Sequence, residues 1–169
     1  MSVPVNYKGK VREFDGPITK TGTSTENWQG TSLAGFLCPN IYASKTNVWF
    51  LQEDALDALI LAQAELIDAG CSVLLVDAYR TYEEQAEAKK NKPHLVAPPW
   101  KSEHPKGTAI DARMFDEDLI PIEGDDGAIF DEANKSTWGD QDYLAEVLEK
   151  YGFVRTALPA EDWHFSFRG

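Results

Sequence analysis

The 169-residue chain has little positive charge, because 16 lysines and arginines stand against 28 aspartates and glutamates, a formal net charge of −12. Such a surface would repel nucleic acids and anionic membranes, so we expect neither as a partner. The chain has no run near the ~18 apolar residues that a membrane-spanning helix needs. Its first residues also lack the apolar stretch of a signal peptide. We therefore expect a cytoplasmic protein.

Cysteine is scarce as well, with only Cys38 and Cys71 and no Cys-x-x-Cys pair. Neither residue sits in a pattern typical of a nucleophile or a metal ligand. A cytoplasmic location argues against a disulfide between them. Cys71 opens an apolar run and is expected to be a small buried hydrophobe, and Cys38 is expected to be structural too.

The chain does contain alternating helical and strand-like patterns that fit one domain over residues 1–169, with 1–26 as a peripheral N-terminal segment. Residues 1–47 read as loops and short strands, and four prolines make residues 92–107 a proline-rich loop. Helices are expected at 52–70, 81–91 and 140–152, and strands at 72–76, 108–115, 153–156 and 163–167. The result is an α+β fold, with helices packed on a small antiparallel sheet.

Histidine is also scarce, with only three residues in the chain. His104 lies at the end of the proline-rich loop, just before the strand that carries Asp111, and His164 begins the last strand. Neighbouring strands could bring Asp111 and His164 together, and His104 could reach the same point from the loop. Two imidazoles and one carboxylate form a recognised zinc set, with a fourth position for water in catalytic sites. His94 has no such neighbours and is expected to be an exposed loop residue.

Two further residues have the chemistry that such a site would use. Glu161 lies three residues before His164, where a carboxylate could take a proton from water and hand it to a leaving amine. Arg80 directly follows a buried strand, so its guanidinium could face a cleft and stabilise a developing oxyanion. Taken alone, Glu161 could equally be a solvated loop acid. Arg80 could be a surface residue paired with Glu83 or Glu84.

Four stretches, in this order and spacing, resemble the zinc peptidases that include the D-alanyl-D-alanine dipeptidases and carboxypeptidases: DAYRTYEEQ, KSEHPKGTAID, FDE and EDWHF. The signature of that family is S-x-H, six residues, D, and later E-x-W-H, and it occurs here in full. The resemblance runs from about Asn27 to the C-terminus. It is greatest with the dipeptidases of the vancomycin-resistance type, whose characteristic stretches resemble ENWQGTSLAGF, VAPPWKSEHPKGTAID and AIFDEANKST.

By this resemblance the chain is a zinc peptidase that hydrolyses D-alanyl-D-alanine, a small peptide of D-amino acids, with one Zn²⁺ per chain. The implied zinc ligands are His104, Asp111 and His164. Glu161 would be the general base, and Arg80 would stabilise the transition state. Ser102 and Asp131 would line the pocket for the substrate's free ammonium group.

Two departures from the dipeptidase pattern border the expected substrate pocket. Asp162 stands where the dipeptidases usually have a tryptophan, and the acidic segment PIEGDDGAIF differs from their M-G-x-x-F pattern. Substrate length therefore stays open between three kinds of enzyme: the dipeptidase, a carboxypeptidase that trims D-Ala from peptidoglycan stem peptides, and an endopeptidase of the L-Ala-D-Glu type.

A non-catalytic zinc-binding module, like the signalling domain of hedgehog proteins, is an alternative of another class. A degenerate site would have lost its base or its oxyanion group. The presence of both Glu161 and Arg80 argues against that alternative. No residue pattern indicates an oligomeric state.

Overall fold

The computed structural model describes residues 2–7, 10–15, 18–39, 46–69, 71–94, 96–115, 141–157 and 161–169. Within these residues the strands form three antiparallel sheets. The first sheet pairs β1 (Ser2–Tyr7) with β2 (Lys10–Asp15), and the second has the order β3 (Thr19–Glu26), β4 (Ser32–Pro39) and β5 (Thr46–Leu51). The third has the order β6 (Ser72–Asp77), β7 (Ala109–Phe115), β9 (His164–Phe167) and β8 (Phe153–Val154).

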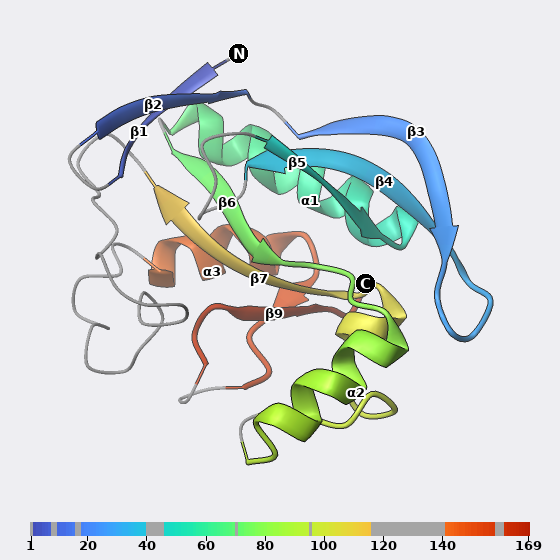
Figure 1. Ribbon diagram of the computed structural model, residues 1–169. Coiled ribbons are helices and arrows are strands. Elements are labelled where there is room, and N and C mark those ends of the chain that lie inside the picture. Colours follow the sequence, from blue (N-terminus) through green and yellow to red (C-terminus); the bar gives the residue numbers. More distant parts are fainter. Residues whose placement is uncertain are drawn as a thin grey trace.

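Among the residues that the structure describes, three α-helices accompany these sheets: α1 (Glu53–Asp68), α2 (Tyr82–Asn91) and α3 (Gln141–Lys150). A 3₁₀ turn, η1 (His104–Lys106), ends the proline-rich loop. The predicted α+β class is confirmed (Figure 1). Two details differ from expectation. The strand expected at 153–156 has only two residues, and the N-terminal region forms long strands, with eight residues each in β3 and β4.

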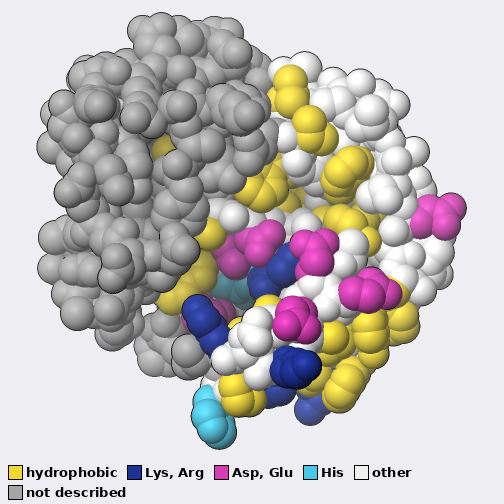
Figure 2. All heavy atoms as spheres, in the orientation of Figure 1, with side chains coloured by type: hydrophobic (Ala, Val, Ile, Leu, Met, Phe, Trp, Pro, Cys, Tyr) yellow, Lys and Arg dark blue, Asp and Glu magenta, His cyan; other side chains and the backbone are white. Residues whose placement is uncertain are grey.

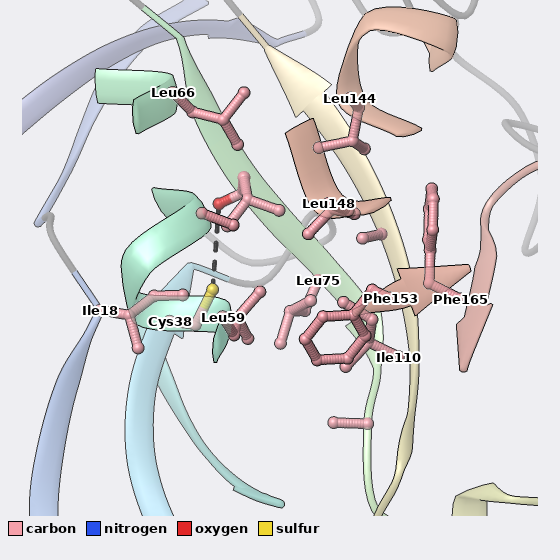
Figure 3. Close-up of a cluster of buried hydrophobic side chains, with 14 of the residues drawn as sticks. Ile18, Cys38, Leu59, Leu66, Leu75, Ile110, Leu144, Leu148, Phe153 and Phe165 are labelled. Atoms are coloured by element: carbon pink, nitrogen blue, oxygen red, sulfur yellow. Dashed lines mark hydrogen bonds between the residues drawn. The ribbon is translucent and has the colours of Figure 1, made fainter. Parts of the chain in front are cut away.

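The core lies where α1 and α3 pack on each other and on the third sheet. Leu59 of α1, Leu75 of β6 and Leu148 of α3 have no exposed surface and face one another in Figure 3. Cys38 of β4 lies in the same cluster, and its thiol donates to the carbonyl of Val73 over 3.9 Å. Both cysteines are buried and free, as predicted.

Helix α2 lies apart from this core, at the lower right of Figure 1, beside η1. It begins with a capping box, in which Thr81 Oγ1 accepts from the Glu84 N–H and Glu84 accepts from the Thr81 N–H. Gln85 of α2 is buried, and its side-chain amide donates to the Ala97 carbonyl over 2.7 Å. That bond holds the proline-rich loop against the helix. Across the described ranges, every helix is too short or too polar to cross a bilayer.

Candidate metal centre and active site

Three neighbouring strands place chemically active side chains in one row. In the antiparallel register, Asp111 of β7 lies opposite His164 of β9 on one side and opposite Asp77 of β6 on the other. A register shift between Leu75 and Asp77 marks a bulge at the end of β6. A bulge re-aims the side chain that follows it, so Asp77 joins the row instead of continuing the strand alternation.

His104 joins this row from the proline-rich loop. Its Nδ1 donates to the carbonyl of Ala78 over 2.6 Å, and its own carbonyl accepts from the Arg80 N–H over 3.4 Å. The turn that carries it ends at Gly107, whose φ of +79° lies in the left-handed region that favours glycine. Two hydrogen bonds to the segment after β6, one from the imidazole and one to the His104 carbonyl, thus fix where the imidazole points.

The three predicted zinc ligands come together in the structure. One potential ligand atom from each of His104, Asp111 and His164 lies within 4.8 Å of the others. Asp111 Oδ1 is 3.3 Å from His104 Nε2 and 3.0 Å from His164 Nδ1. This convergence is the placement that the sequence led us to expect, and metal binding itself stays a prediction.

Both histidines use their second ring nitrogen outside this cluster. His104 Nδ1 is engaged by the Ala78 carbonyl, and His164 Nε2 lies 3.3 Å from Ser166 Oγ. These bonds leave His104 Nε2 and His164 Nδ1 to face Asp111. Metal-ligating histidines are usually oriented in this way by a second hydrogen bond. The donor set of two imidazoles and one carboxylate therefore fits Zn²⁺.

Asp111 and His104 each stabilise the charged form of the other. Burial alone would raise the pKa of Asp111, but the charge of His104 and hydrogen bonds from both histidines hold that pKa well below its usual range. Burial lowers the pKa of His104, but the Asp111 carboxylate outweighs it and raises the pKa above the usual value. The Asp111 carboxylate is thus ionised and can act as a ligand near neutral pH.

Arg80 borders the cluster and is not paired as a surface residue with Glu83 or Glu84. Its Nε lies 2.9 Å from Asp77 Oδ2, and its Nη2 lies 3.9 Å from Asp111 Oδ2. The Arg80 side chain keeps 22% of its surface exposed, so the guanidinium can meet a ligand. Basic, acidic and histidine side chains meet in a hollow near the centre of the face in Figure 2. Asp77, which holds the guanidinium, was not singled out from the sequence, although it opens the DAYR stretch.

Glu161 lies in the turn that precedes β9, where its N–H donates to the Ala157 carbonyl over 2.9 Å. Burial and the charge of Asp111 raise the pKa of Glu161, whereas both histidines and Arg80 partly oppose this effect. The Glu161 carboxyl therefore lies within electrostatic range of the whole cluster. Its half-buried position differs from the fully solvated loop acid of the simpler interpretation.

One residue that the sequence did not indicate links the two halves of the site. The buried side-chain amide of Gln141 donates to the carbonyl of Ala112 over 2.9 Å and to that of Asp162 over 3.4 Å. Ala112 follows the predicted ligand Asp111, and Asp162 follows Glu161. Gln141 is the first residue of α3, and a glutamine at that place carries no sequence signal of such a role.

The departure at Asp162 has a structural counterpart on β7. Asp162 is 4% exposed, and Arg113 is 1% exposed. Burial lowers the pKa of Arg113 to about 9, and the charge of Asp162 opposes that fall. Arg113 lies two residues after Asp111, on the same face of the strand. Asp162, a buried carboxyl whose charge acts on the buried Arg113, therefore stands at the position where the dipeptidase pattern has a tryptophan.

The remaining predicted residues have different outcomes. Ser102 is buried, and its Oγ accepts from the His104 N–H over 3.3 Å, so it lies beside the cluster. Its contact with a substrate stays a prediction. Asp131 lies outside the described residues. His94 is exposed, as expected.

The chain is similar to proteins of one enzyme family. The family model described as VanY, D-alanyl-D-alanine carboxypeptidase, matches residues 49–169. No curated protein sequence matches the chain.

Solved structures share the fold. The LdcB LD-carboxypeptidase, whose structure bears on peptidoglycan recognition, is 24% identical at a TM-score of 0.53, over 71% of this chain and 60% of that one. The vancomycin-resistance D,D-pentapeptidase VanY in complex with Zn(II) is 19% identical at a TM-score of 0.50, over 78% of each chain. VanYB in complex with D-alanine-D-alanine is 18% identical at a TM-score of 0.50, over 87% of this chain and 77% of that one. The chain thus spans 60% of the length of the LD-carboxypeptidase.

Gly107 gives a test of how the loop positions His104. In Gly107→Ala the new Cβ would lie 2.5 Å from Leu33 Cδ2, at a φ of +79°. Gly22→Ala is the matched control, because it has the same φ of +79° and no atom within 4 Å of the new Cβ. Both variants carry the cost of a positive φ, about 1–2 kcal/mol. We expect Gly107→Ala to lose about 1 kcal/mol more in urea unfolding, and to bind Zn²⁺ more weakly by calorimetry. Equal stability loss with unchanged zinc affinity in both variants would contradict this account.

Proposed function

Because the chain belongs to the VanY family of D-alanyl-D-alanine carboxypeptidases, which are zinc metallopeptidases, we propose that it hydrolyses the peptide bond of a terminal D-alanyl-D-alanine. The observation that carries the proposal is the convergence of His104, Asp111 and His164, with both histidines oriented by bonds outside the cluster. These three residues would hold the metal. Bound Zn²⁺ would supply the Lewis acidity that activates water near neutral pH and polarises the scissile carbonyl.

Glu161 is the proposed general base. Its carboxylate would accept a proton from the attacking water and deliver that proton to the leaving amine of D-alanine. It stands three residues before His164 in the same turn, so the backbone that positions the imidazole also positions the base. Gln141 supports this arrangement, because its side-chain amide donates to the carbonyls of Asp162 and Ala112, the residues that directly follow Glu161 and Asp111.

Arg80 is the proposed oxyanion stabiliser. As water adds to the peptide carbonyl, negative charge develops on its oxygen, and a fixed guanidinium stabilises it. The ion pair with Asp77, at 2.9 Å, holds Arg80 before substrate arrives, so little reorganisation is needed. Nη2 remains on the side of Asp111, which is where the cluster lies.

Substrate length separates two candidates. The family description and the LD-carboxypeptidase fold favour a carboxypeptidase that acts on longer peptides. The stretches ENWQGTSLAGF and AIFDEANKST resemble the dipeptidases and favour the free dipeptide D-Ala-D-Ala. We propose the carboxypeptidase as the main activity, with the dipeptidase as the second candidate.

The direct experiment compares N-acetyl-D-Ala-D-Ala with free D-Ala-D-Ala on zinc-loaded protein, and follows the release of D-alanine. The carboxypeptidase proposal expects chelator-sensitive cleavage of the acetylated peptide at a higher kcat/KM than that of the dipeptide. Cleavage of the dipeptide alone would mean that a free ammonium group is required, and would establish the second candidate instead. If zinc-loaded protein released no D-alanine from either substrate, both candidate activities would be contradicted.

Replacement of Glu161 tests the base. Glu161→Gln keeps the size of the side chain and removes its basicity, so we expect kcat to fall by about 10²- to 10⁴-fold. Zinc content, measured by atomic absorption, should stay equal to that of the parent protein. Glu149→Gln, on the exposed surface of α3, is the matched control and should keep full activity. Near-normal turnover by Glu161→Gln would remove this residue from the mechanism.

Arg80 and Asp77 are tested as a pair. Arg80→Ala should lower kcat by about 10²- to 10³-fold, the usual effect of losing one oxyanion donor. Asp77→Asn keeps the guanidinium but removes the charge that anchors it, so a smaller loss of kcat is expected. Steady-state kinetics on N-acetyl-D-Ala-D-Ala measure both effects. A rise in KM with unchanged kcat would show instead that Arg80 only binds the substrate.

A further inference from the structure

Two side-chain amides from the N-terminal half of the chain bind the turn that carries His104. The amide of Asn27 donates to the carbonyl of Lys106 over 2.9 Å, and the amide of Gln52 donates to the same carbonyl over 3.0 Å. Both lone pairs of that oxygen are therefore used. The backbone N–H of Gln52 also donates to the Gly107 carbonyl over 2.9 Å, so three hydrogen bonds hold the end of η1.

Asn27 is almost fully buried, and its side chain also shapes the turn between β3 and β4. Its exposed fraction is 6%, and its Oδ1 accepts from the N–H groups of Gln29 and Thr31, each over 2.9 Å. The backbone N–H of Asn27 donates to the Thr31 carbonyl over 3.0 Å. The β3–β4 turn, the loop at the far right of Figure 1, thus fixes the side chain whose amide reaches Lys106.

The β3–β4 turn also contacts the segment that carries Arg80. The hydroxyl of Tyr79, directly before Arg80, donates over 3.4 Å to the carbonyl of Glu26, the last residue of β3. Trp28 packs edge-on against Tyr82, the first residue of α2, at 5.4 Å between ring centroids. The second sheet is therefore connected to η1 and to the chain that leaves β6, the two segments that meet at the metal centre.

The anchored carbonyl lies two residues from the imidazole, along backbone that is itself hydrogen-bonded. The His104 carbonyl accepts from the Gly107 N–H over 3.1 Å and from the Arg80 N–H over 3.4 Å. The imidazole Nδ1 donates to the Ala78 carbonyl over 2.6 Å. Without the two amides, only the bonds to the segment after β6 would hold the position of the turn. Metal ligands need support of this kind, because a shift of about 0.5 Å is enough to spoil a site.

We propose that Asn27 and Gln52 are positioning residues, whose amides fix η1 so that the His104 imidazole faces Asp111 in the geometry that binds the metal. We call these two side chains the amide anchor. The inference rests on the metal centre of the proposed function and deepens it, because it names residues outside the ligand set on which that centre depends. Neither residue would touch the metal or the substrate, and both would act through the Lys106 carbonyl.

Replacement of Asn27 by aspartate tests the amide anchor, because it keeps the size of the side chain and removes the donor. In Asn27→Asp an oxygen replaces Nδ2, 2.9 Å from the Lys106 carbonyl oxygen, and neither atom has a proton to donate. We expect the zinc affinity, measured by competition with a chromophoric chelator, to fall by about tenfold in Asn27→Asp and in Gln52→Glu. Gln29→Glu adds the same charge to the same turn on an exposed residue, so it should bind zinc as the parent does.

The hydrogen bond from His104 Nδ1 to the Ala78 carbonyl gives a second readout, which needs neither metal nor substrate. His104 is 3% exposed, so its Nδ1 proton should exchange slowly with solvent in the metal-free parent protein. We expect proton NMR to show exchange about tenfold faster in Asn27→Asp and unchanged in Gln29→Glu. Val147→Ala, which weakens the core on α3, is the control for a general loss of stability and should keep the slow exchange.

The two readouts separate this proposal from the proposed function. Weaker zinc binding and faster exchange in Asn27→Asp, in a protein that cleaves neither D-alanyl peptide, would support the amide anchor and contradict the peptidase. Unchanged zinc affinity in Asn27→Asp would overturn the amide anchor and leave the peptidase. Equal losses in Val147→Ala would also overturn it, because they would show only a general effect of stability.

Discussion

The antiparallel register of β6, β7 and β9 is the constraint on which the site depends. It aligns Asp77, Asp111 and His164 in one row, and a slip of one residue in β7 would turn Asp111 to the opposite face of the sheet. That register is stabilised by the core beneath it, where buried residues of the sheet pack against α1 and α3. The stability of the core and the geometry of the site are therefore coupled through β7. Ile110 and Ala112 pack in the core, whereas Asp111 between them belongs to the site.

The electrostatics of the site follow from this row. Asp111 is partly buried between two histidines and Arg80, so its negative charge is compensated from three sides. Two further opposite charges, Arg113 and Asp162, are almost completely buried, and the charge of Asp162 opposes the fall that burial causes in the pKa of Arg113. Isolated buried charges would be costly, and paired ones can hold a defined geometry at a modest cost.

Much of the site could be predicted from the sequence because its ligands lie at strand positions next to recognisable turns. His104, Asp111 and His164 occur in two short motifs, and the strands predicted around them were adjacent in the sheet. Asp77 was missed because a bulge, which leaves no clear sequence pattern, brings it into the row. Gln141 was missed because its bonds are to backbone carbonyls, which any sequence has. The edge-on contact between Trp28 and Tyr82 joins residues more than 50 positions apart, and periodicity cannot reveal such a contact.

We propose that His104, Asp111 and His164 hold the metal on which the activity depends. X-ray absorption at the zinc edge tests it most directly, with protein stripped by a chelator and reloaded with one equivalent of Zn²⁺. We expect the zinc ligands to be nitrogen and oxygen atoms with the scattering pattern of two imidazoles, and one imidazole to be lost in His164→Ala. A shell that contains sulfur, or one that is the same in His164→Ala, would contradict it.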